Sequence, residues 1–158
     1  MIKRRRIRFE SAAQVAADAR WLLAGGYQCA RRWTLAKVCE HLSQTIEASV
    51  DSERGFGGFK APLRYRVVGR PVMHLILLSR WIPAGVKLPE AVLPKSEDDP
   101  KAVGRLTRAL EAMEKHQGVW SAHPFFGRMT DRQWRAYHLV HAAHHLSFLV
   151  PRDQPQRE

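Results

Sequence analysis

Apolar side chains recur three and four positions apart in four segments of the chain, which is the spacing of an amphipathic helix. Glycine and proline clusters that break helices separate these segments, and no stretch alternates apolar and polar residues as a strand would. The pattern therefore predicts one all-α domain over residues 1–158, a four-helix bundle. Its expected helices lie within 11–24, 32–50, 99–118 and 131–149.

Capping residues mark the ends of these helices. Ser11 and Thr130 are each followed by Gln three positions later, which is the capping-box pattern of a helix N-terminus. Thr34 and Asp99 are the expected N-caps of the other two helices. Pro151 ends the last helix, since proline cannot continue one without loss of a hydrogen bond.

An insert over residues 55–98 separates the second and third bundle helices. Residues 61–80 are expected to be helical, with an interruption near Gly69 and Pro71. Residues 81–100 contain four prolines and are expected to form an extended loop. The whole insert is therefore the least regular part of the chain, and we expect it to cover the histidine cluster or a dimer interface.

Composition is typical of a cytoplasmic domain with its own core. Apolar residues make up 45% of the chain, and the two cysteines, Cys29 and Cys39, form no disulfide framework. The start of the chain is charged but lacks the apolar stretch of a secretory signal. The most apolar run, residues 67–82, is too short and too charged to span a bilayer.

The net charge of +11 is concentrated in the first half of the chain, and five cationic side chains lie in a basic tail over residues 1–8. Such a charge favours nucleic acid, anionic lipid or anionic small molecules, although a solvated tail needs no partner. The chain has no nucleic-acid-binding motif, which makes nucleic acid an unfavoured partner.

Residues 60–82 interleave arginines with large apolar side chains. A helix lying on a membrane surface has this composition, and so does a helix laid across a bundle with its arginines in water. The second alternative is favoured here, because a break at Pro71 would divide the apolar face that a membrane helix needs.

Four of the eight histidines lie within residues 138–145. His141 and His145 are four residues apart, so a helix places them about 40° apart on one face, where two imidazoles can bind one metal ion. Trp134, Tyr137 and Phe148 share the face of His141, which indicates that the pair points into the bundle.

A metal site with this pair needs a third ligand from another helix. His41 is the best-placed candidate, in mid-helix beside an apolar stripe, and His74 and His123 are competitors. The alternative is that the histidines are structural and satisfy one another by hydrogen bonds.

Two sequence blocks carry a family resemblance. One is "RWTLAKVCEHLSQTIE", a helix with a histidine in its middle, and the other is "HPFFGRMTDRQWRAYHLVHAAHHLSFLV". Together they make residues 7–151 resemble the DinB-like superfamily of four-helix bundles, and more narrowly a subfamily described as a domain of unknown function.

The resemblance implies that His41, His141 and His145 bind one divalent metal, most often zinc or nickel. It also implies, for some relatives, a transferase or isomerase reaction with a low-molecular-weight thiol. The last helix of this chain lacks the arginine-containing run that follows the histidine pair in many relatives, and the 55–98 insert suggests a substrate lid or a dimer surface.

The leading hypothesis is therefore a metal-dependent transferase or hydrolase acting on an unidentified small molecule. The substrate pocket, or the residues that hold the metal ligands, would include His138, His123, Trp134 and Tyr137. The alternatives are a non-catalytic bundle with structural histidines that binds a small ligand or partner, and a basic protein that binds nucleic acid or another anionic surface. The oligomeric state is left open between a monomer and a homodimer.

Overall fold

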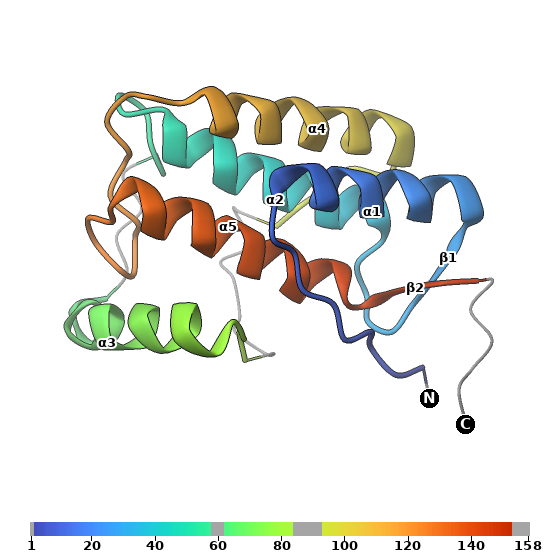
Figure 1. Ribbon diagram of the computed structural model, residues 1–158, viewed down its shortest axis with the longest axis horizontal. Coiled ribbons are helices and arrows are strands. Elements are labelled where there is room, and N and C mark those ends of the chain that lie inside the picture. Colours follow the sequence, from blue (N-terminus) through green and yellow to red (C-terminus); the bar gives the residue numbers. More distant parts are fainter. Residues whose placement is uncertain (1, 58–61, 84–92, 153–158) are drawn as a thin grey trace.

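The computed structural model describes residues 2–57, 62–83 and 93–152. This part of the chain forms five helices and two short strands (Figure 1). In chain order they are α1 (Ala12–Gly25), β1 (Tyr27–Cys29), α2 (Leu35–Val50), α3 (Leu63–Ser79), α4 (Asp99–Lys115), α5 (Asp131–Leu146) and β2 (Leu149–Pro151).

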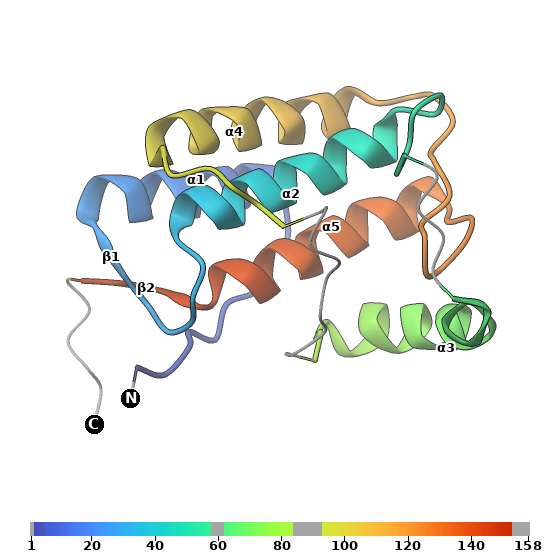
Figure 2. The ribbon, with the colours of Figure 1, turned by 180° about the vertical axis from the view of Figure 1, so that it is seen from behind.

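Four helices form the bundle, and the fifth lies outside it. In two opposite views, α1 and α5 run in one direction and α2 and α4 in the other (Figures 1 and 2). The chain must therefore cross back between α2 and α4, and α3 belongs to this crossing, where it lies along α5. The all-α prediction is confirmed.

The core consists of the apolar stripes that helical spacing predicted to face inward. The bundle helices bury aliphatic residues and alanine against one another, while a second, aromatic cluster lies between α3 and α5. Because α5 contacts the bundle on one side and α3 on the other, it is buried around most of its circumference. For this reason α5 buries imidazoles as well as apolar side chains.

The caps follow the sequence with one correction. Ser11, Thr34 and Thr130 cap α1, α2 and α5, and the capping box at Thr130 is complete. The N-cap of α4 is Asp98, whose side chain accepts from Lys101 N, and not Asp99 as predicted.

Asp99 instead joins α4 to the start of α2. Its carboxylate accepts hydrogen bonds from the Tyr27 hydroxyl at 2.8 Å and from Ala36 N at 2.7 Å. A carboxylate at a helix N-terminus is favoured by the unpaired N–H groups there. This contact fixes the N-terminal end of α2, one turn before His41.

The expectation that no strand forms was wrong at one place. β1 and β2 pair as an antiparallel two-stranded ribbon, with Tyr27 opposite Pro151. Each strand has only three residues, too few to show an alternating pattern. The ribbon also ends α5 at Leu146 rather than at residue 149, and it closes the end of the bundle where α2 begins.

The interruption expected near Pro71 was also wrong, because α3 is continuous from Leu63 to Ser79 with Pro71 inside it. Pro71 is exposed, so the carbonyl of Val67 that loses its helical partner can be hydrated. The helix approaches the loop before α5 at Gly69, where a Cβ atom would collide with the Phe125 carbonyl oxygen. Residues 84–92, the middle of the predicted extended loop, lie outside the described residues.

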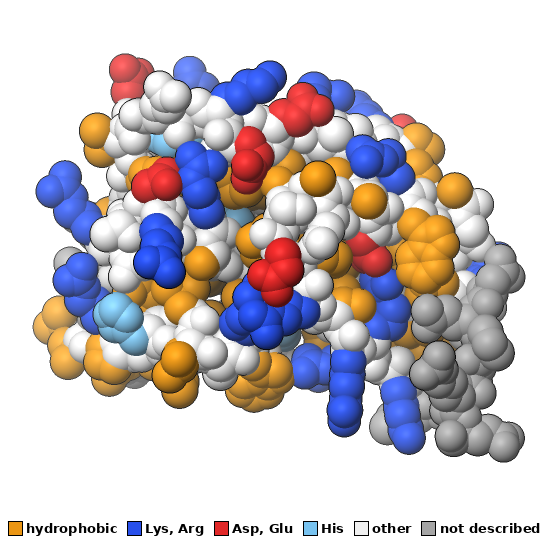
Figure 3. All heavy atoms as spheres, in the orientation of Figure 1, with side chains coloured by type: hydrophobic (Ala, Val, Ile, Leu, Met, Phe, Trp, Pro, Cys, Tyr) orange, Lys and Arg blue, Asp and Glu red, His pale blue; other side chains and the backbone are white. Residues whose placement is uncertain are grey.

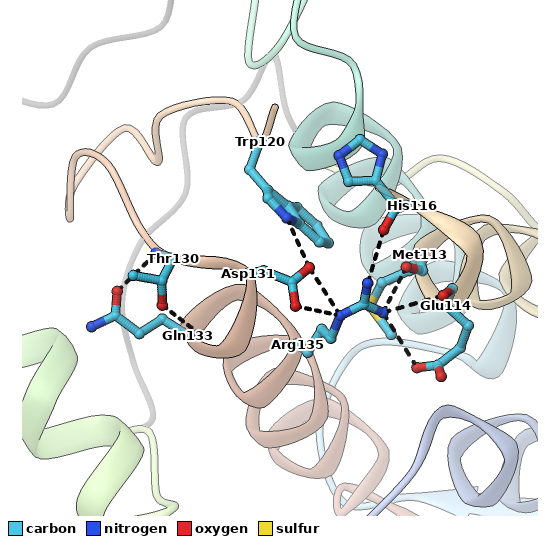
Figure 4. Close-up of polar contacts among 8 residues, drawn as sticks. All are labelled: Met113, Glu114, His116, Trp120, Thr130, Asp131, Gln133 and Arg135. Atoms are coloured by element: carbon cyan, nitrogen blue, oxygen red, sulfur yellow. Dashed lines mark hydrogen bonds and ion pairs between the residues drawn. The ribbon is translucent and has the colours of Figure 1, made fainter. Parts of the chain in front are cut away.

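Arg135 fixes the first turns of α5 against the end of α4 (Figure 4). Its guanidinium donates to the carbonyl oxygens of Met113 at 2.8 Å and His116 at 3.0 Å, and it also pairs with Asp131. A cation at the C-terminus of a helix satisfies carbonyls that have no helical donor. Asp131 also accepts a hydrogen bond from Trp120 Nε1, so several hydrogen bonds hold the segment between the two helices in place.

No helix among the described residues is long and apolar enough to cross a membrane.

Candidate metal centre

Three histidines from two helices meet at one end of the bundle. His41 lies in the second turn of α2, and His141 and His145 lie in the last two turns of α5. Because α2 and α5 run in opposite directions, the start of one lies beside the end of the other (Figure 1). The predicted pairing of His41 with the two histidines of α5 is therefore realised in space.

The three imidazoles face one another through the same ring nitrogen. His141 Nε2 lies 3.2 Å from His41 Nε2 and 3.1 Å from His145 Nε2. All three candidate ligand atoms lie within 4.8 Å of one another, a grouping that could hold a metal ion. Among the described residues this is the cluster of histidine, cysteine and carboxylate groups that is close enough to do so.

Aromatic rings hold two of the three imidazoles in orientation. The Trp33 ring stacks on His145, with centroids 5.2 Å apart and planes at 10°. Tyr137 stacks on His141 in the same way, at 5.3 Å and 19°. His141 Nδ1 has no hydrogen-bond partner in the described part of the chain, so ring packing rather than an outer hydrogen bond sets the orientation of this residue.

Burial keeps the three imidazoles neutral at pH 7. Loss of hydration lowers the pKa of His41 to about 4 and holds the pKa values of His141 and His145 well below 6.5. The His41 and His145 rings also disfavour a positive charge on His141, and the His41 ring disfavours one on His145. Neutral imidazoles present free lone pairs, which is the protonation state that a metal requires.

His138 is turned away from the three histidines. Its Nε2 atom lies 2.9 Å from the hydroxyl of Ser49 on α2, and burial lowers its pKa to about 3. The Ser49 hydroxyl donates to the Ile46 carbonyl oxygen, so it is left to accept the Nε2 proton of His138. This side chain therefore joins α5 to α2 as a neutral hydrogen-bond donor.

His123 holds the loop before α5. Its Nδ1 atom accepts from the backbone N–H groups of Phe125 and Phe126 at 3.1 and 3.2 Å. Burial lowers its pKa to about 3, which keeps this acceptor free of a proton. Its ring packs with Trp134 and Tyr137 in the aromatic cluster, and Tyr137 links that cluster to His141.

The remaining histidines lie elsewhere. His74 is exposed on α3, and His116 is the C-cap of α4. The His144 ring meets the His145 ring edge-on at 4.9 Å, and its pKa is lowered to about 4, first by burial and then by the charge of Arg4. Cys39 is a free thiol packed in the core, where burial raises its pKa to about 12, and Cys29 is a free, exposed thiol.

Two residues at the site were not recognised in the sequence. Trp33 belongs to the "RWT" motif, but it lies outside the helix, so helical periodicity could not predict which way its side chain points. Ser49 lies on the inward stripe of α2, and the absence of a nearby polar partner in sequence concealed its bond to His138.

A family model matches residues 1–152, nearly the whole chain. The chain belongs to the family described as Protein of unknown function (DUF1569). No curated protein and no solved structure matches the chain. The family therefore agrees with the narrower resemblance, to a domain of unknown function, and the function has to be inferred from the site.

Proposed function

We propose that His41, His141 and His145 bind one divalent metal ion through their Nε2 atoms, in a centre of the DinB-like type, and that the protein is a metal-dependent transferase or hydrolase. The observation that carries the proposal is the convergence of three Nε2 atoms from two helices, with His141 Nε2 within 3.2 Å of both others.

The spacing of the nitrogens fits metal coordination. Two nitrogens bound to tetrahedral zinc at about 2.0–2.1 Å lie about 3.3–3.4 Å apart, and two adjacent octahedral ligands lie about 3.0 Å apart. The observed separations of 3.1 and 3.2 Å fall between these values. Zinc and nickel are thus both compatible with the site.

Hydrogen bonding alone does not satisfy the same three groups. In a neutral imidazole, Nε2 has either one proton or one lone pair in the ring plane, so His141 Nε2 can make one well-aligned hydrogen bond. It nevertheless has two neighbouring nitrogens at hydrogen-bond distance. A metal ion takes one lone pair from each ring and removes this conflict.

The donor set also suggests the chemistry. Three neutral imidazoles leave the charge of a divalent ion uncompensated and at least one coordination position open, as in catalytic zinc sites. A metal held there would supply Lewis acidity that lowers the pKa of a bound water or thiol. A low-molecular-weight thiol is therefore a suitable cosubstrate, and a small molecule with an electrophilic centre a suitable substrate.

The protein's own residues contribute orientation and exclusion of water. Trp33 and Tyr137 fix two ligand rings and cover them with apolar surface. The Tyr137 side chain is buried, and burial raises its pKa, so its phenol remains protonated. His138 and His123 support this arrangement from the adjoining aromatic cluster rather than as ligands.

Metal retention tests the proposal. Untagged protein would be loaded with zinc or nickel, dialysed exhaustively and assayed for metal content, beside His41→Ala, His145→Ala and the exposed control His74→Ala. We expect about one ion per chain in the wild type and in His74→Ala, and loss of the ion in the other two. Equal retention in all four proteins would show that the histidines are structural.

A spectroscopic measurement tests the thiol. The cobalt-loaded protein would be titrated with a low-molecular-weight thiol while its visible absorption is recorded. A new thiolate-to-metal band is expected if the thiol occupies the open position. An unchanged spectrum at saturating thiol would leave water as the reactive ligand and favour a hydrolase over a thiol transferase.

A further inference from the structure

The outer face of α3 is apolar, the reverse of an ordinary surface helix. Its inner face buries Met73, which belongs to the aromatic cluster, and Ile76. On the opposite side Val67, Leu75 and Leu78 are 72%, 64% and 86% exposed. A helix that covers a bundle normally presents polar side chains to water.

These exposed side chains form one continuous strip. At 100° per residue, Val67, Pro71, Leu75 and Leu78 fall within an arc of about 80°. Because α3 does not break at Pro71, the strip runs over most of the length of the helix. The sequence-based reason for setting aside a membrane-surface role, a divided apolar face, therefore does not hold. Exposed apolar side chains continue beyond the arc at Leu63, Val68, Val72 and Trp81.

The surroundings of the strip are cationic. The sequence has no Asp or Glu between Glu53 and Glu90. Arg70 is exposed beside the strip, and its guanidinium reaches the Arg128 carbonyl oxygen. Hydrophobic side chains over α3 and cationic side chains nearer the N-terminus occupy the same lower edge of the molecule (Figure 3). The exposed cations of the N-terminal segment are Lys3, Arg4, Arg6 and Arg8, of which Arg8 pairs with Glu10.

We propose that this edge of the molecule docks on an anionic membrane surface, with the apolar strip of α3 entering the headgroup region. An apolar helix face flanked by Lys and Arg is the pattern of a helix that lies in the membrane interface. Cations close to an anionic bilayer add attraction that falls off within a Debye length. The complementary charges therefore favour an anionic bilayer as the partner of this face.

A second copy of the chain fits this face less well. Two copies related by a twofold axis would bring the same patch together. Arg70 and its cationic neighbours would then meet cations, with no acidic side chain of the segment to pair with them. An anionic lipid surface supplies the negative charge that a second copy lacks.

Vesicle co-sedimentation of the full chain tests the proposal. The protein would be mixed with vesicles of phosphatidylcholine alone, or with added phosphatidylglycerol, at low and high salt. The test variant is Leu75→Gln/Leu78→Gln, which removes apolar surface without a change in charge. The matched control is Val119→Gln, at a residue 68% exposed outside α3.

We expect salt-sensitive binding to the phosphatidylglycerol vesicles, a loss of about tenfold or more in the double variant, and no loss in Val119→Gln. Binding that the double variant retains in full would reduce the interaction to charge alone and overturn the role of α3. Absence of vesicle binding, with a dimer in sedimentation velocity that the double variant dissociates, would assign the face to a second copy. Metal content of the same samples separates this result from the metal proposal.

Discussion

The indole of Trp33 stacks on the imidazole of His145, with ring centroids 5.2 Å apart and planes at 10°. Trp33 also meets His41 edge-on, at 5.2 Å. One side chain that precedes α2 therefore contacts a candidate ligand on α2 and another on α5, and it sets the geometry of the site without being a ligand.

Removal of this ring should weaken metal binding while the fold persists. For Trp33→Ala we expect zinc affinity to fall about tenfold, the lower end of what loss of an orienting group costs a metal site. Trp33→Phe keeps a ring in the stack and should bind nearly as the wild type does. Competition with a chromophoric chelator measures both, and equal affinity in Trp33→Ala would show that the stack is incidental.

The hydrogen bond between Ser49 and His138 should stabilise the fold without affecting metal binding. Ser49→Ala leaves the buried Nε2–H of His138 without an acceptor, so we expect a loss of about 1–3 kcal/mol in the free energy of unfolding. Ser43→Ala is the control, because the Ser43 hydroxyl donates its hydrogen bond to the Cys39 carbonyl oxygen of its own helix. Urea denaturation measures the difference, and metal content should not change. A metal loss in Ser49→Ala would place His138 in the site.

The close approach of α3 to the loop before α5 gives a second test of packing. Gly69→Ala places a Cβ atom against the Phe125 carbonyl, and we expect a destabilisation of about 1–3 kcal/mol. Gly104→Ala on α4 meets only the flexible end of Arg108, at 3.5 Å, and should stabilise the protein by up to about 1 kcal/mol. Thermal unfolding of the pair measures both signs, and a neutral Gly69→Ala would mean that α3 packs less closely than described.

Acid should unfold the protein through its buried histidines. Burial lowers the pKa of His123 and of His138 to about 3 in the folded state, from 6.5. Between these values the unfolded chain binds protons that the folded chain does not. Stability is therefore complete above about pH 6.5 and falls as the pH drops toward 3, by up to about 1.4 kcal/mol per pH unit for each histidine.

A matched pair of variants isolates one of these protons. In His123→Asn the side-chain oxygen can still accept from the backbone N–H groups of Phe125 and Phe126, but nothing titrates. We expect His123→Asn to flatten the dependence of stability on pH by about one proton, whereas His123→Ala should lose stability at every pH. Denaturation curves from pH 4 to 7 make the comparison, and an unchanged slope in His123→Asn would contradict it.

Local patterns in the sequence were sufficient to predict the bundle helices and the shared face of the histidine pair on α5. Helical spacing places His141 and His145 on one face whatever the tertiary structure, and Thr34 and Thr130 cap their helices through contacts within three residues. His41 could only be suggested, because its distance from α5 depends on how two helices pack.

The features that could not be predicted from the sequence depend on contacts between distant segments. Asp98 and Asp99 are equivalent as caps until Asp99 is drawn to Tyr27 and Ala36. The ribbon between Tyr27 and Pro151 joins two segments too short to show a strand pattern. Pro71 is accommodated because it lies on the open side of α3, which only the packing of that helix determines.

X-ray absorption at the zinc edge of zinc-loaded, untagged protein shows directly whether the three histidines bind the metal. We expect one ion per chain bound by three imidazole nitrogens at about 2.0–2.1 Å, with a fourth light ligand from solvent or thiol. His141→Ala, which removes the nitrogen that lies closest to both others, should abolish this spectrum. A spectrum with fewer than two imidazoles, or one that His141→Ala leaves unchanged, would contradict it and leave the three histidines as structural residues of the bundle.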